Sequence, residues 1–166
     1  MNGWTENNEI LRSEVIRNID SDIFCLNETH LLGQKNINIP SYKWLGFNRT
    51  ERHVNAPKGS GGVGVLVKDT LLDEYHVNVI DKCLDGQLGL EFKNKATDFI
   101  FVVFVCYLPP ENSPWGNATD FFGHLISQLY MCSYAGLVFL CGDFNARTGN
   151  LSDIIDDIDR IPERKV

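Results

Sequence analysis

Two short runs in the chain are apolar at every position, and an amphipathic segment lies between them. The runs are residues 99–106 and 137–141. A strand that is apolar on both faces is buried on both faces, so each run predicts a central strand of a sheet. The segment between them carries apolar residues at helical spacing, and Thr119 can cap that helix. Strand, helix and strand in this order predict a βαβ unit within an α/β fold.

The rest of the pattern predicts one domain with a short tail. Apolar residues Ile10, Leu11, Val15 and Ile19 predict a helix over residues 7–18. Little helix separates the further short strands, so both sheets are expected to be mixed, and no repeat or linker interrupts residues 1–150. The further strands are predicted at residues 22–27, 42–47, 62–68 and 88–92. Residues 151–166 form a charged tail in which the strand and helix rhythm stops, which predicts a truncated chain.

Composition excludes several classes of protein. The chain has 166 residues, of which 43% are hydrophobic and 22% charged, as in ordinary globular domains. No apolar run approaches the roughly 20 residues of a membrane helix, and the N-terminus does not resemble a signal peptide. We therefore expect an intracellular protein, nuclear or cytoplasmic, without membrane contacts. Five cysteines without a Cys-x-x-Cys pair predict mainly buried free thiols rather than structural zinc.

Polar residues follow two of the predicted strands at the point where each strand ends. Glu28 ends the first strand within Cys-Leu-Asn-Glu-Thr-His, and Asp143 and Asn145 end the last within Leu-Cys-Gly-Asp-Phe-Asn. Open α/β sheets place their sites at such strand ends, and residues two apart on extended chain point the same way. Taken singly, Glu28 could be a solvated acid and Asp143 a turn residue. Together they predict one polar site at a sheet edge.

Oxygen donors without clustered cysteine or histidine favour Mg²⁺ or Mn²⁺, whose ligand shells are commonly completed by water and substrate phosphate. Tyr107 ends another apolar strand, where its hydroxyl could reach a phosphate oxygen or could simply mark the edge of the core. A net charge of −7 opposes binding to nucleic acid through the overall field. The local cations Arg49, Arg52 and Lys58 either form a solvated loop or meet a phosphate backbone.

Residues 59–64 match Gly-x-Gly-x-x-Gly, but a strand rather than a helix is predicted after them. The match therefore predicts a flexible loop that leads into a strand, and not a nucleotide-binding turn.

These motifs, in this order and spacing, resemble the endonuclease/exonuclease/phosphatase family, and in particular the apurinic-type endonuclease domain of non-LTR retrotransposon reverse transcriptases. The resemblance rests on Asn-Glu-Thr-His at 27–30, Gly-Gly-Val-Gly at 61–64, Tyr-Leu-Pro at 107–109 and Gly-Asp-Phe-Asn at 142–145. It implies a four-layer α/β sandwich with two mixed sheets, and Mg²⁺-dependent cleavage of phosphoester bonds, with DNA as the expected substrate.

Carried over by position, Glu28 resembles the metal-binding glutamate, and Asn2 resembles the second polar residue of the family's first motif, which implies a place at the same metal. Tyr107 resembles the tyrosine at the scissile phosphate, Asp143 the aspartate that activates water, and Asn145 its neighbouring asparagine. The family's first asparagine would precede the chain, and nothing after residue 150 resembles its late aspartate or its terminal Asp-His pair. The resemblance therefore implies an incomplete domain with impaired activity.

Three interpretations stay open from the sequence. The chain is an endonuclease domain of mobile-element origin, a catalytically inactive module that binds a partner, or an inert gene fragment of the same fold. We expect Glu28, Asp143 and Asn145 to converge at one edge of the two sheets. We also expect an unpaired sheet edge near residues 23–26 that favours association.

Overall fold

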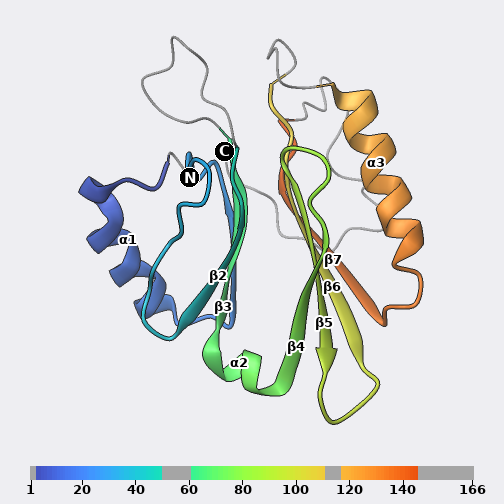
Figure 1. Ribbon diagram of the computed structural model, residues 1–166, viewed down its shortest axis with the longest axis horizontal. Helices are drawn as coiled ribbons and strands as arrows, with labels where there is room; N and C mark the ends of the chain where they lie inside the picture. The colour runs from blue at the N-terminus through green and yellow to red at the C-terminus, as the bar shows by residue number, and fades with distance from the viewer. Residues whose placement is uncertain (1–2, 50–60, 111–116, 146–166) are drawn as a thin grey trace, which may run out of the picture.

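The structure is a computed structural model that describes residues 3–49, 61–110 and 117–145. The helices are α1 (Glu6–Ile19), α2 (Asp69–Glu74) and α3 (Ala118–Met131). The strands are β1 (Ile23–Asn27), β2 (Tyr42–Phe47), β3 (Val63–Lys68), β4 (Tyr75–Asp81), β5 (Gln87–Asn94), β6 (Ile100–Tyr107) and β7 (Leu137–Asp143). Two sheets stack face to face, with α1 outside one and α3 outside the other (Figure 1). The expected four-layer α/β arrangement is confirmed.

The two sheets differ in strand direction. The first has the order β1-β3-β2 and is antiparallel throughout, whereas the second has the order β4-β5-β6-β7 and is parallel only between β6 and β7. Parallel neighbours need a crossover, usually a helix. Only the β6–α3–β7 segment supplies one among the described strands, so the βαβ unit forms as expected and the first sheet lacks the expected mixed pattern.

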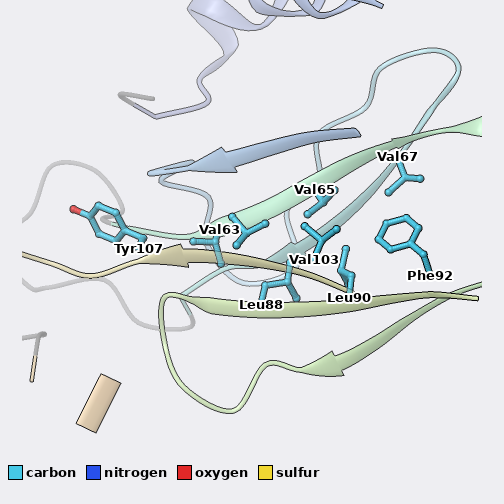
Figure 2. Packing of buried hydrophobic residues seen from close by; sticks show 9 residues of the cluster. Val63, Val65, Val67, Leu88, Leu90, Phe92, Val103 and Tyr107 are labelled. Carbon is cyan, nitrogen blue, oxygen red and sulfur yellow. The ribbon is translucent and has the colours of Figure 1, made fainter. Parts of the chain in front are cut away.

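The main core lies between the two sheets. Alternate side chains of β3, β5 and β6 point into this space, because successive side chains of a strand face opposite ways. Its buried members are Val63, Val65, Val67, Leu88, Leu90, Phe92, Val103, Val105 and Tyr107. Figure 2 shows Tyr107 at one end of this core, with its hydroxyl directed away from the other labelled side chains. The core therefore fixes the position of Tyr107 and leaves its polar end outside.

Several local features differ from the sequence-based expectations. Asn117 rather than Thr119 caps α3, since its side-chain oxygen accepts hydrogen bonds from the amides of Thr119 and Asp120. The helix α1 forms as expected, but it packs through Ile16, which is 4% exposed, while the predicted apolar stripe is exposed. The elements α2 and β4 were not predicted. Within the described residues, no helix is long and apolar enough to span a membrane.

The last strand is the main exception to the predicted core. The structure places β6 in the middle of its sheet but β7 at the edge, with Leu137, Val138, Phe139 and Leu140 each 40–51% exposed. An apolar pattern shows what a strand can bury, but it cannot show whether a neighbouring strand is available. The expectation that residues 137–141 form a central strand is therefore wrong for the described chain. The strand β1 also lies at an edge, as expected.

The exposed edge of β7 generates a prediction about association. We expect wild-type protein to associate as its concentration rises, because an apolar strand with free backbone groups pairs readily with another strand. Leu140→Lys should weaken self-association by about tenfold or more, because it places a charge on that edge. The control is Ile126→Lys, at an exposed apolar position of α3. Sedimentation velocity over a range of concentrations measures both, and equal effects of the two variants would contradict pairing through β7.

The position of Tyr107 generates a second prediction. Gly86 has φ of +83°, and a Cβ atom there would collide with the backbone oxygen of Tyr107. Gly86→Ala should therefore lower the free energy of unfolding by about 2 kcal/mol or more. Gly123 lies in α3 with nothing near its would-be Cβ, so Gly123→Ala should raise it by about 0.5–1 kcal/mol. Urea unfolding distinguishes the two, and no loss for Gly86→Ala would show that this contact is unimportant.

Candidate functional site

The turn after β1 is held by backbone hydrogen bonds from two other segments. Thr29 is fully buried, its amide donates to the carbonyl of Gly62 (3.2 Å), and its carbonyl accepts from the amide of Trp4 (2.6 Å). The amide of Gly3 donates in the same way to the carbonyl of Glu28 (2.9 Å). These three hydrogen bonds fix the backbone of Glu28, so its side chain extends from a rigid turn.

Glu28 and Tyr107 form the central contact of the site. The Tyr107 hydroxyl donates to Glu28 Oε1 at 2.8 Å, which joins the end of β1 to the end of β6 across the two sheets. Tyr107 is 8% exposed. Burial, followed by the hydrogen bond to Glu28, raises the pKa of Tyr107 to about 12. The phenol therefore stays protonated and keeps donating at neutral pH.

Asp143 lies beside Tyr107 on the neighbouring strand. The two residues are register partners of β6 and β7, and the negative charge of Asp143 also contributes to the raised pKa of Tyr107. Asp143 Oδ1 accepts from the amide of Asn145 (2.9 Å), and the Asn145 side-chain NH₂ group donates to the carbonyl of Leu108 (2.8 Å). Glu28 and Asp143 thus both lie near Tyr107, with Asn145 held next to Asp143.

Arg49 lies closer to the core than a solvated loop residue would. Its Nε forms an ion pair with Asp85 Oδ2 at 2.5 Å, and its side chain is only 9% exposed. Its positive charge acts to lower the pKa of Tyr107, against the effect of the carboxylates. Arg49 therefore balances negative charge at the site. The sequence did not indicate that Asp85 would be its partner, because an acid in a loop has no distinctive pattern.

Backbone strain gathers at these residues. Among the described residues, five that are not glycine have positive φ, and Glu28 (+52°), His30 (+57°) and Asn145 (+44°) are three of them. Such conformations cost free energy and persist only where the surroundings impose them, most often at functional sites. The strain supports a functional rather than a purely structural role for the two strand ends.

The donors at this edge fit a hard divalent cation. The residues are two carboxylates, Glu28 and Asp143, and the buried Asn27 Oδ1 nearby has no hydrogen-bond partner. No three His, Cys, Asp or Glu residues gather to hold a metal within the described chain. Mg²⁺ is commonly held by one or two carboxylates together with water and phosphate, so this sparse set is compatible with it.

Three of the predicted site residues, Asn2, Arg52 and Lys58, lie outside the described residues. A surface hollow of about 440 Å³ is lined by His76 and residues 93–98. It lies at the opposite end of β5 from Tyr107 and includes none of the predicted site residues. The site at the strand ends therefore rests on the contacts of Glu28, Tyr107 and Asp143.

Several solved structures have the same fold. The human Nocturnin catalytic domain is 20% identical, with a TM-score of 0.59, and the match covers 86% of this chain and 58% of that one. Truncated Caenorhabditis elegans TDP2 is 15% identical, with a TM-score of 0.56 and coverage of 90% and 60%. The AP endonuclease LMAP from Leishmania major is 11% identical, with a TM-score of 0.51 and coverage of 77% and 39%. At these identities the likeness shows the fold.

A curated protein, the serine/threonine-protein kinase TEL1 of Debaryomyces hansenii, is 24% identical over 165 residues. The match covers 95% of this chain but 5% of that protein, so the kinase activity is not carried over. The chain also spans less than two thirds of each solved relative named above.

The sequence profile of the endonuclease/exonuclease/phosphatase family matches residues 11–158, which is most of the chain. The family's hydrolases act on phosphoester bonds. The matched region contains Glu28, Tyr107 and Asp143, whose side chains the fold brings to one edge of the two sheets. The chain therefore belongs to the endonuclease/exonuclease/phosphatase family.

Proposed function

We propose that this chain is the catalytic part of a Mg²⁺- or Mn²⁺-dependent phosphodiesterase that cleaves DNA, an endonuclease domain of non-LTR retrotransposon origin. One observation carries the proposal: the Tyr107 hydroxyl donates to Glu28 at 2.8 Å beside Asp143. A proton donor close to two carboxylates provides what a phosphate needs, namely a hydrogen bond to its oxygen and acidic groups for a metal and for water.

Each side chain has a distinct role in this proposal. Glu28 would hold the metal, which when bound would polarise the phosphate and stabilise the leaving oxygen. Tyr107 would turn its single hydroxyl hydrogen from Glu28 to a phosphate oxygen, and Asp143 would accept a proton from the attacking water or orient it. The Asn145 NH₂ group already donates to Leu108, so its side-chain oxygen is the atom that can accept from the same water.

Support for DNA as substrate comes from the motif resemblance and from the fold shared with an AP endonuclease. With a net charge of −7, the chain needs local cations to approach a phosphate backbone. Arg49 supplies one beside Tyr107, although it is paired with Asp85. Arg52 and Lys58 are proposed to supply others.

The carboxylates provide the first test of this function. Wild-type protein should nick supercoiled plasmid slowly with Mg²⁺ and not at all with EDTA, and Mg²⁺ should raise its Tm. Glu28→Gln and Asp143→Asn should each reduce nicking to the level of the protein-free control, because each removes a charge that the reaction needs. Asp98→Asn, at an exposed turn far from Tyr107, should leave both readouts unchanged.

Two outcomes would contradict the enzyme proposal. If plasmid binding is retained without metal-dependent cleavage, the chain is better described as a binding module. If Mg²⁺ raises the Tm equally in wild type and Glu28→Gln, the metal is not held at this site.

Tyr107 provides a test based on pH. Its pKa is raised from about 10 to about 12, so its folded-state contribution is fully present below pH 10 and is lost as pH rises through about 12. The difference in unfolding free energy between wild type and Tyr107→Phe should be constant up to about pH 10 and decrease above it. Urea unfolding at each pH measures this, with Tyr130→Phe at an exposed position as control. A difference that vanishes near pH 8 would contradict the raised pKa.

A further inference from the structure

Two cysteines lie on strands of different sheets, a few residues before the strand ends that carry the site. Cys25 lies on β1 opposite Val65, and Cys141 lies on β7 opposite Val105, and both valines belong to the core between the sheets. The Cα atoms of β1 and β7 approach within 8 Å, closer than the roughly 10 Å between stacked sheets. The two thiols are close enough for each to affect the pKa of the other. Within the described residues, the pair therefore lies where an edge strand of one sheet faces an edge strand of the other.

The surroundings set this pair apart from the other cysteines. Cys106 and Cys132 are buried on the α3 side of the second sheet, and Cys83 is exposed in the loop between β4 and β5. Cys25 is exposed and Cys141 is half-buried, so the expectation of mainly buried thiols does not hold for them. A small reagent in solution can therefore reach the pair.

One thiol of the pair also has a hydrogen bond to the backbone. Cys141 donates to the backbone oxygen of Phe104 at 3.3 Å, which orients its sulfur. The thiolate is the nucleophilic form of cysteine, so whichever of the two thiols loses its proton first is the attacking sulfur, and the other is the resolving one.

We propose that Cys25 and Cys141 are a peroxide-sensitive site that forms a disulfide between β1 and β7. The thiolate form of one cysteine attacks one peroxide oxygen, the O–O bond breaks, and the departing oxygen leaves as water after taking a proton. The resulting sulfenic acid is attacked by the sulfur of the other cysteine, which forms the S–S bond and releases the second oxygen as water. Two thiols and one hydrogen peroxide thus give one disulfide and two waters.

The disulfide would form only a few residues from the carboxylates of the site. Glu28 follows Cys25 by three residues, and Asp143 follows Cys141 by two. A covalent bond here ties together the two edge strands that present these carboxylates, and it closes a long loop in the unfolded chain. Oxidation is therefore expected to raise the free energy of unfolding by joining the edge strands β1 and β7.

The test is peroxide treatment of the whole chain, followed by alkylation and mass spectrometry. Wild-type protein should lose two hydrogens in mass, give a cross-linked peptide containing Cys25 and Cys141, and gain about 5 °C or more in Tm. Cys83→Ser should behave as wild type, because that thiol lies outside the pair. Cys25→Ala and Cys141→Ala should lose the cross-link and the gain in Tm, and dithiothreitol should reverse both in wild type.

The wild-type result decides the proposal even if a variant fails to fold. Alkylation of both Cys25 and Cys141 after peroxide treatment would overturn it. So would a cross-link that involves Cys83 or joins two chains, or a cross-link that leaves the Tm unchanged.

Discussion

The face-to-face packing of the two sheets is the constraint on which the rest of the structure depends. Valines of β3 interlock with apolar residues of β5 and β6, and this contact decides which strand ends lie next to each other. Glu28 and Tyr107 are 79 residues apart in sequence, yet their side chains form a hydrogen bond because each leaves the core at the same edge. Local propensity alone would not bring them together.

The sequence predicts this fold well where one strand or helix determines the pattern. Residues 99–106 and 137–141 and the helix between them indicated the βαβ unit, and the motif at 142–145 indicated the acidic strand end. The exposure of β7 could not be predicted, because it depends on which strands are present beside it. The role of Arg49 was equally hidden, since its partner Asp85 comes from the loop between β4 and β5 of the other sheet.

The site combines a rigid frame with few charged groups. Backbone hydrogen bonds fix the Glu28 turn, strand register fixes Tyr107 beside Asp143, and an ion pair holds Arg49 near them. Groups held in place before a substrate arrives do not have to be ordered on binding, which favours catalysis. The chain shares this fold with the family's hydrolases, and the proposed function would use the same frame.

At Glu28 the left-handed backbone lowers stability, while the side chain serves the proposed chemistry. A glycine adopts φ of +52° without strain, so Glu28→Gly should relieve backbone energy even though it removes the carboxylate. The same change also removes the hydrogen bond with Tyr107, so the carboxylate has a structural use besides its chemical one. Selection for heat resistance weighs that hydrogen bond against the backbone strain, whereas a screen for cleavage depends on the acid itself.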